Sequence, residues 1–75
     1  MLLYTIYDRV AMEAGPVFEC KNDEVAVRNY HQVIQQNVVS PGDFILYRIG
    51  EFITDPINLM PESHPVAIPV GGKNG

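Results

Sequence analysis

The residues that most often carry chemistry in proteins are scarce in this chain. Its only histidines are His31 and His64, and its only cysteine is Cys20. No two of these lie at a spacing at which zinc ligands recur, such as Cys-x-x-Cys, so the sequence predicts no metal site. Ser63 adjoins His64 in a proline-rich segment. Adjacency in the sequence does not make them a nucleophile and its base, because such pairs are recognised by their geometry in space.

The acidic residues and the glycines give no catalytic pattern either. Asp8 and Glu51 lie near the ends of expected strands, where charged side chains usually protect a sheet edge. The glycines form no phosphate-binding loop. The sequence therefore predicts a protein that is not an enzyme and that needs no cofactor.

Aromatic and basic side chains indicate another chemistry, the binding of single-stranded nucleic acid. Tyr7 and Tyr47 lie on expected strands, where exposed rings stack on bases at about 1–3 kcal/mol per base. Arg9, Arg28 and Arg48 are the cations that would contact phosphates. The alternative is that these rings belong to the core or to an interface between protein molecules.

The net charge weighs against a nucleic acid held by charge alone. Five basic residues stand against nine acidic ones, for a net charge of −4. The basic residues are Arg9, Lys21, Arg28, Arg48 and Lys73. Because phosphate affinity scales with the number of cations engaged, DNA binding would need base stacking or the assembly of several copies.

Length and composition predict one soluble domain. The chain has 75 residues, of which 47% are apolar and 19% charged, enough apolar material for a core. We expect the domain over residues 1–70 and a loose tail over 71–75. One cysteine leaves no internal disulfide, and the sequence shows no signal peptide and no membrane span. These features favour a reducing cytoplasm.

A helix is expected from Asn22 to about Asn37. Asn22 can cap the first free backbone N–H groups, and two acidic residues follow it, where the helix dipole favours negative charge. An apolar stripe recurs at helical spacing. Its members are Ala26, Val27, Tyr30, Val33 and Ile34.

Strand-forming residues occupy 2–7, 43–52 and 66–70, the last as an edge strand. Residues 17–20 form a further short strand or an extended lead-in to the helix. A proline-punctuated connection is expected over 54–65. The sum is an α+β fold, βαββ-like or ββαββ, with one α-helix packed on an antiparallel β-sheet.

One helix covers one face of such a sheet and leaves the other face apolar. Beside Leu3 and Tyr7, that face presents one of two sets from the longest strand: Phe44 and Leu46, or Ile45, Tyr47 and Ile49. Monomers rarely expose such a patch. The pattern predicts a homo-oligomer, in the simplest case a dimer, or a protein partner. The candidate interface residues are Leu3, Phe44, Ile45 and Leu46.

Four motifs occur in an order that is similar to one known family. They are Tyr4-x-Ile6-Tyr7-Asp8, Gly15-Pro16-x-Phe18, Asn22-Asp23-x-x-Ala26-x-Arg28 and Asp43-Phe44-x-Leu46-Tyr47-x-Ile49-Gly50-x-Phe52. Across residues 4–52 the chain resembles the small non-structural protein of gokushovirus-type microviruses, which are single-stranded DNA phages. It departs from the family pattern at Ile53, where an Asp is common, and in a short connection between Gln36 and Asp43.

The resemblance implies a non-structural phage protein of the host cytoplasm that acts in viral DNA replication or packaging. It supplies no catalytic residues. Three modes of action stay open: contact with single-stranded DNA, a homodimeric module that binds a viral or host replication protein, and a scaffold-like assembly component. Contact with DNA would weaken steeply with salt and would need Arg28 or Arg48, whereas a hydrophobic interface would be nearly insensitive to salt.

Overall fold

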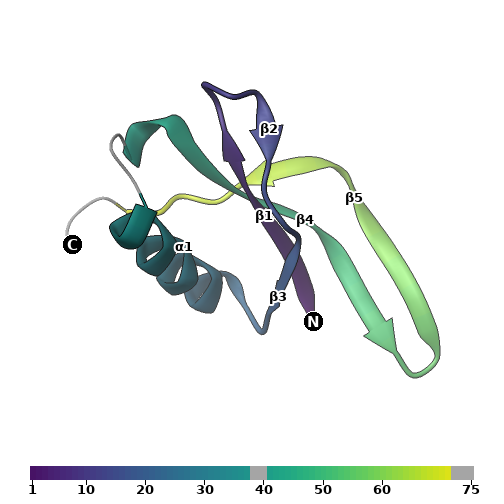
Figure 1. Cartoon of the computed structure of the whole chain (residues 1–75). Coiled ribbons are helices and arrows are strands. Elements are labelled where there is room, and N and C mark those ends of the chain that lie inside the picture. The colour runs from purple at the N-terminus through teal and green to yellow at the C-terminus, as the bar shows by residue number, and fades with distance from the viewer. Residues whose placement is uncertain (38–40, 72–75) are drawn as a thin grey trace.

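The computed structural model describes residues 1–37 and 41–71. Within these ranges the elements run β1 (Leu2–Asp8), β2 (Glu13–Ala14), β3 (Phe18–Cys20), α1 (Asp23–Asn37), the 3-10 helix η1 (Pro41–Asp43), β4 (Phe44–Thr54) and β5 (Ile57–Ala67) (Figure 1). The expected combination of one α-helix with an antiparallel sheet is present. Strands dominate, and three of them precede the helix. Residues 72–75 of the expected tail lie outside the described residues.

The sheet is antiparallel throughout, in the order β2-β1-β4-β5. Strand β3 also pairs with β1, and it does so at the opposite end from β2. Leu2 lies opposite Cys20 in β3, whereas Tyr7 lies opposite Ala14 in β2. The short strands β2 and β3 are therefore two parts of one interrupted edge along β1.

Strands β4 and β5 form a long hairpin whose far end projects away from α1 (Figure 1). The expected strand over 66–70 is wrong in its bounds, because β5 begins at Ile57 and already ends at Ala67. Pro61 and Pro65 fit into it because β5 lies at the edge of the sheet, where a residue without an N–H group can face away from the ladder.

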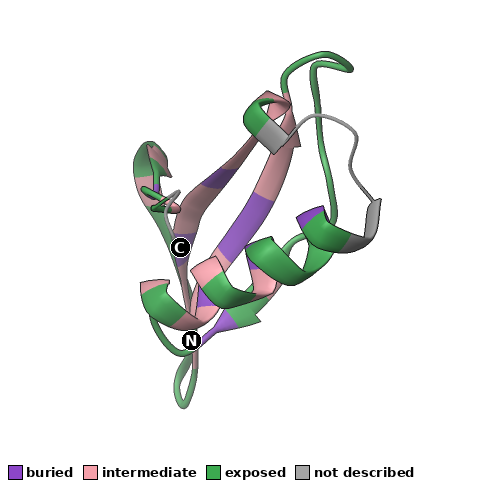
Figure 2. Cartoon of the chain, turned by 90° about the vertical axis from the view of Figure 1, so that its left-hand side faces the viewer, coloured by how far each residue is buried: buried purple, intermediate pink, exposed green. Residues whose placement is uncertain are grey.

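Helix α1 begins where its cap predicts. The side chain of Asn22 accepts a hydrogen bond from the backbone N–H of Val25 at 2.9 Å, which satisfies one of the free donors of the first turn. Of the apolar stripe, Ala26, Tyr30 and Ile34 are buried against the sheet. Figure 2 shows the opposite side of the helix exposed.

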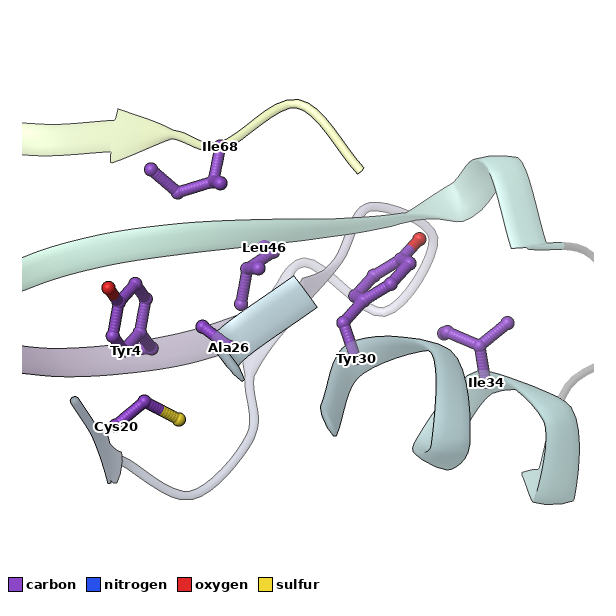
Figure 3. Packing of buried hydrophobic residues seen from close by; sticks show 7 residues of the cluster. All are labelled: Tyr4, Cys20, Ala26, Tyr30, Ile34, Leu46 and Ile68. Atoms are coloured by element: carbon purple, nitrogen blue, oxygen red, sulfur yellow. The ribbon is translucent and has the colours of Figure 1, made fainter. Parts of the chain in front are cut away.

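The core lies between α1 and the strands β1, β3 and β4 (Figure 3). Its buried apolar residues are Tyr4, Cys20, Ala26, Tyr30, Ile34, Leu46 and Ile68. The phenol of Tyr30 reaches from the helix to the sheet and donates to the carbonyl oxygen of Phe44 at 2.8 Å. Truncating a core side chain such as that of Leu46 lowers the free energy of unfolding by about 2–5 kcal/mol. The packing of this core therefore holds α1 in place on the sheet.

Candidate functional site

Strand register decides which of the two apolar sets faces away from the helix. Tyr4 lies opposite Arg48, and Ile6 lies opposite Leu46, on the helix side. Successive side chains of a strand point to opposite faces, so the residues between them lie on the far side of the sheet. We call this far side the outer face and define it by Leu3, Tyr7, Ile45 and Tyr47.

The outer face is apolar and partly exposed. All four of its defining residues are partly exposed, and none packs against the core under α1. The rings of Tyr7 and Tyr47 meet edge to face, with centroids 6.2 Å apart. Thr5 lies directly opposite Tyr47 and is buried, and its hydroxyl donates to the carbonyl oxygen of Gly15 at 2.9 Å. This is the sheet face opposite α1, and its apolar side chains are partly rather than fully exposed.

Two residues of the expected interface do not lie on the outer face. Leu46 is 1% exposed and belongs to the core beneath α1. Phe44 lies opposite Asp8 on the same side of the sheet and packs against that core. The reason is the alternation of the strand, since Phe44 and Leu46 share one parity and Ile45 shares the other with Tyr47. Leu3 and Ile45 remain as interface candidates.

Arg48 is engaged by two carboxylates. Its Nη1 donates to Asp23 on α1 at 2.9 Å, and its Nε donates to Glu62 on β5, also at 2.9 Å. These hydrogen bonds, first that to Glu62 and then that to Asp23, raise the pKa of the guanidinium. The charge expected to meet a phosphate is thus compensated within the protein.

Tyr4 also contacts the group formed by Arg48, Asp23 and Glu62. Its phenol donates to the carboxylate of Asp23, and burial together with that bond raises the pKa of the phenol. Sequence reasoning placed Asp23 only in the first turn of the helix and left Glu62 in a loop. Arg48 joins Asp23 to Glu62 only because β4 pairs with β5, and no local sequence pattern predicts that pairing.

The other expected nucleic-acid residues are not gathered into one surface. Tyr7 and Tyr47 lie on the outer face, whereas Arg28 lies on α1, across the sheet from them. The side chain of Arg48 also points to the helix side, toward Asp23. Arg9 is exposed directly after β1, and its backbone N–H donates to the carbonyl oxygen of Asp43.

The side chains with catalytic potential have structural partners. Cys20 is 2% exposed, and burial raises the pKa of its thiol against the opposing hydrogen bond from Asn29. The Nε2 of His31 lies 2.9 Å from the carbonyl oxygen of Val70, and the Nδ1 of His64 lies 3.3 Å from the hydroxyl of Ser63. Residues 1–37 and 41–71 contain no cluster of three potential metal ligands.

A groove of about 580 Å³ opens on the helix side, between α1 and the end of β1 that pairs with β2. Ile6, Phe18, Ile34 and Phe44 line it, together with two acidic residues, Asp8 and Glu13, which we call its acidic rim. Sequence reasoning missed this groove because it arises from the spacing between the helix and the strands.

Comparison with known proteins places the chain among phage proteins. A family model described as Phage ORF5 protein matches residues 1–73, a range that includes every strand and α1. No curated protein and no solved structure matches the chain. In the part of the chain that the structure describes, no helix is long and apolar enough to cross a membrane.

Proposed function

The chain belongs to the Phage ORF5 protein family, and on that premise we propose that it is a non-enzymatic phage accessory protein that works as a homodimer. Its stage of action is viral single-stranded DNA replication or packaging in the host cytoplasm, where it binds a viral or host replication protein. The resemblance of residues 4–52 to the small non-structural microvirus protein supports this stage. The observation that supports the dimer is the outer face, whose defining residues are uncharged and partly exposed.

A second copy of the chain suits the outer face for an electrostatic reason. With a net charge of −4, two copies repel each other, so contact is least unfavourable where no charge lies. Leu3, Tyr7, Ile45 and Tyr47 are all uncharged. A two-fold contact uses the same patch on both subunits, which an uncharged apolar patch permits.

The ends of the outer face carry opposite charges. The exposed Glu19 lies opposite Leu3 at one end, and the exposed Arg9 follows β1 at the other. In the dimer that we propose, the two-fold axis lies in the interface and runs across β1. That arrangement brings Glu19 of one subunit toward Arg9 of its partner.

Sedimentation equilibrium tests the dimer. Wild type should sediment as a dimer at micromolar concentration at both low and high salt, and Ile45→Asp should sediment as a monomer with an unchanged circular dichroism spectrum. Val17→Asp is the matched control, since Val17 is 57% exposed and lies outside the outer face. A monomeric wild type, or a dimeric Ile45→Asp, would overturn the proposal.

A charge reversal tests the orientation. Glu19→Arg and Arg9→Glu should each weaken the dimer, because each places like charges together at both ends of the interface. The double variant restores opposite charges and should recover most of the affinity. If the double variant dimerises no better than the single ones, the axis runs in another direction.

The edge-to-face pair of Tyr7 and Tyr47 favours a second candidate, the stacking of single-stranded DNA on the outer face. Fluorescence anisotropy of a labelled oligonucleotide at low and near-physiological salt separates the two. Micromolar binding that fades with salt and is lost in Tyr47→Ala supports DNA contact. Absence of binding at both salts rules it out and leaves the dimer interface as the role of these rings.

The biological stage is tested in a phage that encodes the protein. Deletion of its gene should lower the yield of packaged single-stranded DNA while the capsid protein is still produced. The protein should be absent from mature particles. Its presence there in stoichiometric amounts would contradict the non-structural assignment.

A further inference from the structure

The groove on the helix side is a second recognition site, separate from the outer face. We propose that it binds a short segment of a partner protein in which an apolar side chain adjoins a Lys or Arg. The apolar side chain enters between α1 and the sheet, and the cation meets the acidic rim. This site lies across the sheet from the proposed dimer interface, so both can be occupied at once.

The floor of the groove is built for an apolar group. Ile34 on α1 is buried, while Ile6, Phe18 and Phe44 on the strands are partly exposed. These four side chains come from four different elements held together by the core, so the floor is formed before any ligand arrives. Its volume of about 580 Å³ accommodates a few side chains and falls within the range of about 300–1,000 Å³ typical of ligand sites.

The rim supplies the charge preference. Asp8 and Glu13 lie directly opposite each other where β1 pairs with β2, a like-charge pair that disfavours the pairing. The Oδ1 of Asp8 accepts the backbone N–H groups of Val10 and Ala11. Within residues 1–37 and 41–71, neither carboxylate has a cationic partner. A cation from a partner would relieve the repulsion between them.

The same charges argue against the β4–β5 hairpin of a second copy as the occupant. One exposed apolar segment that a second copy offers is the far end of the β4–β5 hairpin, where Ile57 and Leu59 are 77% and 56% exposed. Asp55 and Glu62 flank that segment, and residues 53–67 contain no Lys or Arg. Insertion of this hairpin would place acid against acid, whereas a segment that carries Lys or Arg matches the charge of Asp8 and Glu13.

Selection from a random heptapeptide display library against the immobilised full chain tests the proposal. Enriched peptides should share an apolar residue next to Lys or Arg. Their affinity, measured by anisotropy of the labelled synthetic peptides, should fall at least 10-fold in Glu13→Lys, which reverses the rim charge. Glu24→Lys makes the same charge change on α1 outside the groove and should leave the affinity within about 2-fold.

A second pair of variants tests the apolar part. Val33 lines the groove and is 43% exposed, so Val33→Lys should block it and lower the affinity at least 10-fold. Leu59→Lys, at a position on β5 that is 56% exposed and does not line the groove, is the matched control. The proposal is overturned if no peptide is enriched, if the enriched peptides lack a basic residue, or if both groove variants bind like wild type.

Discussion

The guanidinium of Arg48 donates to both carboxylate oxygens of Asp23, at 3.2 and 2.9 Å, and so joins β4 to the first turn of α1. Through Nε it also holds Glu62 on the edge strand β5. One side chain thus connects three elements that the sequence separates. Hydrogen bonds between charged groups contribute more than neutral ones, although partial exposure to water reduces their net effect.

Removing this connection should destabilise the fold. We expect Arg48→Met, which keeps much of the aliphatic stem, to lower the free energy of unfolding by about 1–2 kcal/mol because Asp23 and Glu62 then lose their shared cation. Urea denaturation measures the change. Arg28→Met is the control, since Arg28 is exposed on α1, and it should change the value by no more than about 0.5 kcal/mol. Equal effects of the two substitutions would contradict a structural role for Arg48.

Stability should fall in alkaline solution because of Tyr4. Burial and the bond to Asp23 raise the pKa of this phenol above its ordinary value of 10.0. Below that value the phenol is protonated in both states, and its contribution to stability is complete. Above it the unfolded chain loses the proton while the folded chain keeps it, so unfolding becomes more favourable as pH rises.

The measurement is the free energy of unfolding from about pH 8 to pH 11.5. One such group lowers it by up to about 1.4 kcal/mol per pH unit above pH 10. Tyr30, whose pKa burial also raises, adds to the fall. Tyr4→Phe should cost about 1 kcal/mol at pH 8 through the lost hydrogen bond and should make the alkaline fall shallower. An unchanged slope would show that Tyr4 ionises equally in both states.

The buried thiol of Cys20 should be inert in the folded protein. Only the thiolate reacts readily, and burial both raises the pKa of this thiol and hides it. Ellman's reagent should therefore label native protein at least about 100-fold more slowly than protein in denaturant. Val17→Cys in a Cys20→Ala background provides an exposed thiol as the control. Rapid labelling of native wild type would mean that the segment around β3 opens easily.

Gly50 should resist substitution because the hairpin closes tightly on it. A Cβ at this position would lie 2.9 Å from the carbonyl oxygen of Met60 and 3.1 Å from the Cα of Pro61, both backbone atoms. We expect Gly50→Ala to cost about 1–3 kcal/mol in a thermal or urea denaturation. At Gly42 a Cβ meets no atom within 4 Å, so Gly42→Ala should be neutral or slightly stabilising. Similar costs at both positions would contradict the close approach.

How much could be predicted from the sequence depends on whether the signal is local. The helix was predictable because its cap at Asn22 and its apolar stripe lie within one segment, and β1 was predictable from its β-forming residues. The bounds of β5 were not, because Pro61 and Pro65 read as loop residues unless the strand is known to lie at an edge.

The candidate sites divide in the same way. That α1 covers only one face of the sheet follows from having a single helix, and in the structure the apolar residues of the outer face are partly exposed. Which residues form that face could not be decided, because Phe44, Ile45, Leu46 and Tyr47 are apolar on both parities and only the pairing with β1 separates them. The partners of Arg48 and the groove at Asp8 and Glu13 depend on contacts between distant segments.

The projecting end of the β4–β5 hairpin gives the molecule two levels of protection from amide hydrogen exchange. The ladder between β1 and β4 ends at Leu2 and Glu51, and residues 53–58 pair only within the hairpin. Opening that end breaks a few hydrogen bonds and exposes none of the buried core, so its amides exchange through local fraying. The amide hydrogen of Leu46, which lies under α1, exchanges only when the whole domain unfolds.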